Sequence, residues 1–239
     1  YSREVGGIAK TNYSGGQILD CLFDGSAGST DDYIGGIAVG NGQDGLISGC
    51  IYCGSMGSGN EKAGIVVRNS GSITQCCANM PTSGAHYGLC WENSGSIQKS
   101  YAIVSYKRYW PLCLVGSVDE PGIVSQCYLS SYEQGDYPCD GFVGSAPDAG
   151  FADSFWDMNA TRLASSPYGG QGRTTVEMMQ KATFTTELAA LGETPWDFEN
   201  VWDIREGQTY PWLRALGEIA VVPYEVSDLP VAEWPHDAD

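Results

Sequence analysis

The chain has 239 residues, of which 29 are acidic and 12 are basic, so its formal net charge is −17 at pH 7. This acidity argues against nucleic-acid binding and against adsorption to anionic membranes, because both partners are themselves negatively charged. No apolar run approaches the roughly 18 residues of a membrane-spanning helix, and the length predicts one elongated domain with a sizeable core.

The pentapeptide NSGSI occurs at Asn69–Ile73 and again at Asn93–Ile97, and it sets a register for the first two thirds of the chain. In this register we recognise six imperfect units, each with a Gly-Gly-Ile-like start and a later element that ends in Cys or Ser beside a large apolar residue. The starts are Val5–Lys10, Ile34–Val39, Ala63–Val67, Tyr87–Trp91, Leu112–Gly116 and Asp140–Gly144. The later elements are Ile18–Phe23, Ile47–Tyr52, Ile73–Ala78, Ile97–Ala102, Val124–Leu129 and Phe151–Trp156. A period of 24 to 29 residues is typical of a repeat array in which each unit packs on its neighbour.

Each unit contains two runs of about 4–6 residues rich in Ile, Val, Tyr and Phe, separated by Gly, Ser, Asn and Asp, which is the chemistry of strands and turns. The units are too short for a crossover helix, and propeller blades need about 40 residues. We therefore expect an all-β fold, a right-handed parallel β-solenoid of about six coils, with equivalent strands roughly 4.8 Å apart.

Two columns of residues follow from this register. The start column contains Gly7, Gly36, Gly64, Gly88, Cys113 and Gly141. The second column contains Cys21, Cys50, Cys76, Ser100, Cys127 and Ser154. Small, nearly isosteric side chains at one position per coil predict an interior ladder of buried thiols and hydroxyls, and stacked side chains that point the same way have poor disulfide geometry.

The remaining cysteines leave the disulfide pairing open. Some of Cys53, Cys77, Cys90, Cys113 and Cys139 could pair, and the odd total of nine leaves at least one thiol unpaired or bonded between chains. Cys50 and Cys53 form a C-x-x-C motif, but no second pair at zinc spacing accompanies it and it lacks the βαβ context of a redox site. We therefore expect no metal or redox role.

Beyond Ser154 the sequence changes character. Thr174–Glu177 fits a capping box for a short helix that extends to Phe184, and a second helix is predicted over Thr186–Leu191. The Trp-rich run Trp196–Leu213 is expected to fold over the last coil, because the end of a solenoid exposes backbone and core. The cap tryptophans would be Trp156, Trp196, Trp202 and Trp212, with a carbohydrate-stacking platform as the alternative.

The predicted domains are therefore a solenoid over 1–157, a cap with short helices over 158–216 and an acidic tail over 217–239. The tail has no Lys or Arg, and its residues 218–226 have the composition of a strand. It would pack along the side of the solenoid. Alternatively, it would join the open edge of the first coil of another copy, and such a head-to-tail contact builds a filament.

The unit resembles the GLUG repeat, whose pattern is roughly G-G-L-V-G-x-N, a glycine-bearing turn and I-x-x-C-Y. The stretch from Ser154 is similar to the closing segment of long bacterial GLUG-repeat surface proteins, and the resemblance covers about residues 5–216. The matching closing segments are Phe155–Asp157, Gly169–Met178, Trp196–Phe198, Val201–Ile204 and Tyr210–Leu213. The third and fourth units are short, and the fifth has Cys113 where the pattern has glycine.

The resemblance implies a secreted or surface-exposed bacterial protein, often adhesin-like, and a repeat that also occurs as an accessory part of immunoglobulin A proteases. It implies location and architecture more than activity, because the repeat has no established chemistry. The chain opens with YSREVGG, which lacks the features of a signal peptide. We therefore expect a processed chain or part of a longer solenoid.

Catalytic constellations are weak in this sequence. The carboxylates Asp31, Asp32, Asp44 and Glu61 do not recur in one column as they would in a polysaccharide-active β-helix, and solvated turns explain them better. The same holds for Arg68 and the Lys99–Lys107–Arg108 patch. The histidines are His86 and His236, which exclude a Ser-His-Asp or HExxH centre unless His86 acts alone. We expect no catalysis and no cofactor, with Ca²⁺ as the one ion that such carboxylates would admit.

One basic-aromatic turn is a candidate ligand site, formed by Tyr106, Lys107, Arg108, Tyr109 and Trp110. If exposed, it would bind an acidic glycan or the carboxylates of a partner; otherwise its aromatic rings are packed. Two sequons, Asn12–Ser14 and Asn159–Thr161, matter only in a host that glycosylates.

The sequence therefore predicts an extracellular structural or adhesin-like protein that mediates attachment or assembly through a protein or glycan partner, or through copies of itself. A glycan-binding or glycan-cleaving β-helix and a self-assembling filament subunit are the alternatives.

Overall fold

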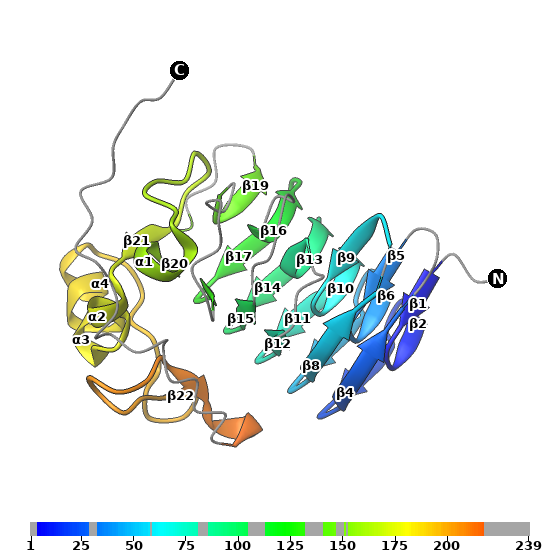
Figure 1. Ribbon diagram of the computed structural model, residues 1–239, viewed down its shortest axis with the longest axis horizontal. Helices are drawn as coiled ribbons and strands as arrows, with labels where there is room; N and C mark the ends of the chain where they lie inside the picture. The colour runs from blue at the N-terminus through cyan, green and yellow to red at the C-terminus, as the bar shows by residue number, and fades with distance from the viewer. Residues whose placement is uncertain are drawn as a thin grey trace.

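The computed structural model describes residues 4–28, 33–57, 59–80, 86–104, 113–131, 141–146, 151 and 153–217. Within them the chain forms a parallel β-solenoid of about four turns, in which short strands of successive turns stack side by side (Figure 1). No described helix is long and apolar enough to cross a membrane. The fold class predicted from the repeat is therefore confirmed at the level of a parallel β-solenoid.

Three parallel sheets form the walls of the solenoid, and we call them sheets A, B and C. Sheet A contains β1 (Glu4–Gly6), β2 (Ala9–Asn12), β5 (Tyr33–Gly35), β6 (Ala38–Asn41), β9 (Glu61–Ala63), β10 (Val66–Asn69), β13 (Tyr87–Asn93), β16 (Cys113–Val118) and β19 (Val143–Ser145). Sheet B contains β3 (Gln17–Leu19), β7 (Leu46–Ser48), β11 (Ser72–Thr74), β14 (Ser96–Gln98) and β17 (Ile123–Ser125). Sheet C contains β4 (Leu22–Ala27), β8 (Ile51–Met56), β12 (Cys77–Met80), β15 (Tyr101–Val104), β18 (Tyr128–Ser131), β20 (Phe155–Asp157) and β21 (Gln171–Arg173).

The corner between sheets B and C is made by one residue per turn with left-handed backbone geometry. These residues are Asp20, Gly49, Gln75, Lys99 and Gln126, with φ between 48° and 63°. Each directly follows a strand of sheet B and precedes the Cys/Ser column. A single left-handed residue turns the chain sharply from one sheet into the next, and its repetition at equivalent positions is consistent with the register of the strands on both sides.

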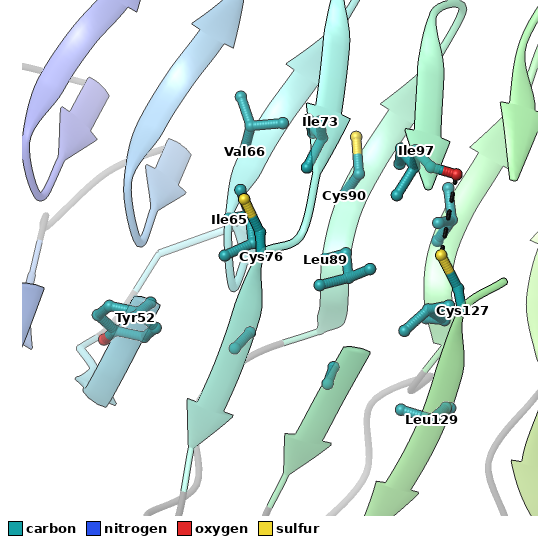
Figure 2. Close-up of a cluster of buried hydrophobic side chains, with 14 of the residues drawn as sticks. Tyr52, Ile65, Val66, Ile73, Cys76, Leu89, Cys90, Ile97, Cys127 and Leu129 are labelled. Atoms are coloured by element: carbon teal, nitrogen blue, oxygen red, sulfur yellow. Dashed lines mark hydrogen bonds between the residues drawn. The ribbon is translucent and has the colours of Figure 1, made fainter. Parts of the chain in front are cut away.

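The core lies between the sheets and is built from columns of apolar side chains. Ile47, Ile73 and Ile97 pair in register along sheet B and are fully buried. Figure 2 shows Ile73 and Ile97 from this column beside Val66 and Cys90 of sheet A, with Cys76 and Cys127 at the corner of sheet C. The apolar positions of every repeat therefore meet inside one continuous core.

The bend in sheet A explains the glycine of the start column. A Cβ on Gly36 would clash with the Gly64 carbonyl oxygen, and one on Gly64 would clash with that of Gly88. Each glycine therefore allows the close approach of the next turn.

The fifth unit departs from the predicted alignment. Cys113 pairs with Tyr87, and Val115 pairs with Cys90, so Gly88 and Leu89 lie opposite Leu114 alone. Cys113 therefore does not occupy the glycine position, as the sequence alignment predicted, because β13 carries an extra residue at this bend and β16 does not.

The C-terminal segment contains four short helices and a small hairpin. The helices are α1 (Met158–Thr161), α2 (Thr175–Met178), α3 (Lys181–Phe184) and α4 (Thr186–Ala190), and the 3-10 turn η1 spans Arg214–Leu216. The hairpin pairs β22 (Trp202–Asp203) with β23 (Trp212–Leu213) antiparallel. The predicted capping box is present, since Thr174 and Glu177 exchange side-chain and backbone hydrogen bonds. The predicted first helix is divided into α2 and α3.

The Trp-rich segment lies along the outer face of sheet C rather than over the last coil alone. Trp196 and Trp202 pack in one cluster with Cys77, Tyr101 and Tyr128, which come from three successive strands of that sheet. The outer face of sheet C is itself apolar and is buried by these side chains. Trp156 is instead a core residue, whose indole donates to the Leu163 carbonyl.

Candidate functional site

Several sequence-predicted positions lie outside the described residues. They are Tyr106, Lys107, Arg108, Tyr109 and Trp110, together with Asp31, Asp32, Cys139, His236 and the tail from residue 218. Among the others, Asp44 is exposed in a turn and Lys99 is one of the left-handed corner residues. Two of the charged residues singled out in the sequence lie close to other polar side chains: Glu61 is near His86, and Arg68 is near Glu92.

The Cys/Ser column forms a continuous ladder that is buried from Cys50 to Ser154, whereas Cys21 in the first turn is partly exposed. Each of the four thiols donates to the carbonyl two residues before it, at 3.1 Å for Cys21, 3.3 Å for Cys50 and Cys76, and 3.2 Å for Cys127. The Ser100 hydroxyl does the same at 2.8 Å, whereas the Ser154 hydroxyl donates to Asp153 Oδ1 at 3.4 Å. The Cys127 thiol also lies 3.8 Å from the Ile97 carbonyl of the preceding turn (Figure 2). The two serines accept the backbone N–H of the preceding turn, from Cys76 to Ser100 and from Cys127 to Ser154. This column therefore connects successive turns through hydrogen bonds.

The described cysteines all carry reduced thiols. The hydrogen bond from Cys76 lowers the pKa of Cys50 to about 7, whereas burial raises the pKa of Cys76 well above its usual value. No group of three or more His, Cys, Asp or Glu side chains within the described residues could hold a metal ion.

A second ladder, of asparagines, was missed by the sequence reasoning. Asn12 donates its side-chain N–H to Asn41, Asn41 to Asn69 and Asn69 to Asn93, each over 2.8 Å. The same amides also donate to the turns between sheets A and B. The available signal was the first letter of NSGSI, since Asn69 and Asn93 begin the two copies and Asn12 and Asn41 precede them at similar spacing. In the folded chain the Asn12 side chain is not accessible for glycosylation, because its amide is buried and hydrogen-bonded.

A buried carboxylate connects the solenoid to the C-terminal segment. Asp157 Oδ1 accepts from Thr175 Oγ1 at 3.0 Å and from the backbone N–H of Asn159 and Ala160, and Oδ2 accepts from the Tyr210 hydroxyl at 2.6 Å. Burial raises the pKa of Asp157, and its hydrogen bonds with Tyr210 and the others offset part of that rise. Three of the closing motifs therefore meet at one acceptor with a structural role.

Aromatic and charged side chains from several strands gather on the outer side of sheet A. We call this set the sheet A aromatic cluster, and it consists of Tyr33, Tyr87, Trp91, Arg68, Glu4, Glu61 and Glu92. The Arg68 guanidinium lies 4.3 Å from the centre of the Tyr33 ring and 5.6 Å from that of Trp91. Arg68 Nε also bonds Glu92 Oε2 at 3.1 Å, and its Nη1 lies 4.0 Å from Glu4. The cluster therefore combines aromatic surface with fixed polar groups.

Electrostatics in the cluster follow from partial burial. Burial raises the pKa of Glu61, although its hydrogen bond with Tyr87 opposes the rise and the nearby Glu92 adds to it. Burial and the Glu61 carboxylate raise the pKa of Tyr87. Burial, together with the charge of Lys62, lowers the pKa of His86 to about 4, so this histidine is uncharged at pH 7. His86 Nδ1 lies 3.9 Å from Glu61 Oε2.

Comparison of the chain with models of known protein families, with curated proteins and with solved structures found no match.

Proposed function

We propose that the chain is a structural, adhesin-like protein, secreted or displayed on a bacterial surface, whose solenoid mediates attachment or assembly without catalysis. The observation that carries this proposal is the use of interior polar groups. In the asparagine ladder and the Cys/Ser column, buried polar groups form hydrogen bonds with the neighbouring turns. A fold that commits its buried polar groups in this way is suited to a rigid scaffold.

We also propose that all six sequence units are coils of the solenoid. Pairing of Val115 with Val143 and of Tyr128 with Phe155 supports a solenoid that includes all six sequence units as right-handed coils. The Trp-rich segment would then be a cap that covers the side of the last coils. The GLUG resemblance supports the extracellular location, and the net charge of −17 supports a protein or uncharged glycan partner rather than nucleic acid or membrane.

The location is tested by digesting intact producing bacteria with an external protease. We expect the full-length chain to disappear from intact cells, or to be found in the medium, while a cytoplasmic marker stays intact. Protection of the chain until the cells are lysed would contradict the proposal.

Assembly is tested by electron microscopy and light scattering of the full-length chain and of a chain without residues 218–239. Rods or filaments that require the tail would support a filament subunit. A full-length chain that is monodisperse at high concentration would leave attachment as the remaining function.

One observation favours glycan cleavage as a second candidate. Glu61 is partly buried, with a raised pKa, beside a second carboxylate, Glu92, that is ion-paired with Arg68. Two carboxylates in different environments are the usual arrangement for glycoside hydrolysis. Release of reducing sugar from oligosaccharides by the wild-type chain, lost in Glu61→Gln, would replace the non-catalytic proposal.

A further inference from the structure

The aromatic side chains on the outer faces of sheets A and C differ in how far they are buried. On sheet C, Tyr101, Tyr128 and Phe155 are fully buried beneath the C-terminal segment. On sheet A, Tyr33 and Trp91 are only half-buried. Aromatic surface that the protein's own segments leave accessible marks a position for a ligand or partner.

The rings on sheet A are arranged with nearly parallel planes. The Tyr33 and Trp91 centroids are 5.9 Å apart with an interplanar angle of 22°, and those of Tyr87 and Trp91 are 6.3 Å apart at 20°. The rings pack over Ala63 and Val67, which are fully buried. These separations and angles are those of offset-stacked rings, so Tyr33, Trp91 and Tyr87 form one continuous aromatic group.

A glycine makes room for this surface. Gly116 lies opposite Trp91, because the flanking pairs are Cys90 with Val115 and Glu92 with Ser117. A Cβ on Gly116 would lie 2.6 Å from the Tyr87 ring and 2.7 Å from the Trp91 ring. Glycine at position 116, in the fifth unit, therefore leaves space for both rings, and a larger residue would displace them.

Hydrogen-bonding groups are held next to the rings. The side chains of Arg68 and Glu92 are each 41% exposed, and that of Glu4 is 30% exposed. Because Arg68 is bonded to Glu92 and stacked on Tyr33, its guanidinium has a fixed position, with N–H groups available beside the rings. Aromatic surface with a few positioned polar groups is the usual composition of a ligand site.

We infer that the sheet A aromatic cluster is a binding site for an uncharged carbohydrate. The C–H face of a sugar ring packs on the accessible part of Trp91, and its hydroxyls bond to the carboxylates and to the guanidinium that is stacked on Tyr33. Three carboxylates and the charge of −17 disfavour acidic glycans and phosphates. This inference rests on the proposed attachment function only for its biological role, since the binding can be measured with the isolated chain.

The test is binding of the full-length chain to an array of neutral and acidic oligosaccharides, followed by calorimetry with the best neutral one. We expect neutral oligosaccharides to bind, and Trp91→Ala to weaken binding about tenfold or more, as for an aromatic residue at the centre of an interface. Leu191→Ala is the matched control, because Leu191 is an exposed apolar residue on the far C-terminal segment, and it should bind as the wild type does. Trp110→Ala, in the basic-aromatic turn predicted from the sequence, should also leave binding unchanged.

A folding defect is separated from a binding defect by Glu92→Gln. This substitution keeps the volume of the side chain but removes the charge that orients Arg68, and we expect a several-fold loss of affinity with an unchanged melting curve. Absence of neutral-glycan binding, retention of binding in Trp91→Ala, or loss only in Trp110→Ala would each overturn the inference. A chain that attaches to cells without binding any glycan would refute the inference but not the attachment function. A chain that binds glycans but attaches to no cell would support the inference and refute the attachment function.

Discussion

At the scale of single residues, buried amides hold successive turns of the solenoid together. Asn41 donates to Gly45, Asn69 and Ser72 and accepts from Asn12, so one side chain connects three turns. Because the ladder is buried, no water replaces a lost partner, and the cost of removing one amide includes the groups that it leaves unpaired.

We predict that Asn41→Ala lowers the free energy of unfolding by about 3 kcal/mol or more, since several buried groups lose partners worth about 1–3 kcal/mol each. Asn12→Ala should cost less, because Asn12 is at the end of the ladder and bonds only to one neighbouring turn. Urea denaturation of both variants measures the difference. Equal losses would show that the ladder does not act between turns.

Asp157 gives a prediction that depends on pH. Its folded pKa is raised by burial, so the stability that its protonated form contributes is complete below the unfolded pKa of 3.8 and is lost as pH rises through the folded value. Asp157→Asn cannot ionise. The stability of the wild type relative to Asp157→Asn should therefore fall as pH is raised from about 4.

Denaturation of the wild type and Asp157→Asn across pH measures this difference, and titrations elsewhere cancel because they are common to both chains. Asp157→Ala is the control for lost hydrogen bonds, and it should be the less stable variant by about 2–3 kcal/mol because four donors lose their acceptor. A wild-type advantage that grows with pH would contradict the assignment.

At the scale of elements, the C-terminal segment is part of the wall of the solenoid rather than an appendage. The indoles of Trp196 and Trp202 are stacked 4.4 Å apart, and Trp202 lies 6.1 Å from the Tyr101 ring and 6.2 Å from that of Tyr128. The segment and sheet C thus share one apolar layer, so we expect them to unfold together.

We predict that Trp202→Ala lowers the free energy of unfolding by about 3–5 kcal/mol, the usual cost of deleting a large buried aromatic. Leu191→Ala, at a position that is 62% exposed, should change it by less than about 0.5 kcal/mol. Fluorescence and circular dichroism should report the same transition in the wild type. Two separate transitions would show that the segment folds independently.

At the scale of the whole molecule, most of the described thiols are buried, either between the sheets or beneath the C-terminal segment. Six of the described cysteines are buried, and Cys21 and Cys53 are partly exposed. A reducing agent should therefore not change the stability that these residues contribute, since the turns are joined by hydrogen bonds and packing.

We predict that a thiol reagent labels Cys21 and Cys53 quickly in the native state and the buried cysteines only after denaturation. Peptide mass spectrometry identifies the sites. Rapid labelling of Cys76 or Cys127 in the native state, or their isolation as a disulfide, would contradict a shielded ladder.

The sequence by itself determined the repeat, the strand chemistry and the Cys/Ser column, because equivalent strands pair one turn apart and a periodic fold repeats its environments. Local signals also located the capping box at Thr174, which depends on residues three positions apart.

Only the tertiary structure decided the remaining features, because they depend on which faces meet. Trp196 and Trp202 pack along the side of the solenoid because the outer face of sheet C is apolar. Cys113 does not align with the glycine column because β13 has one more residue than β16 at the bend. The sheet A aromatic cluster combines Tyr33, Arg68 and Trp91 from three different turns. No spacing in the sequence marks them as neighbours, since side chains that lean along the solenoid axis come together only when the turns are stacked.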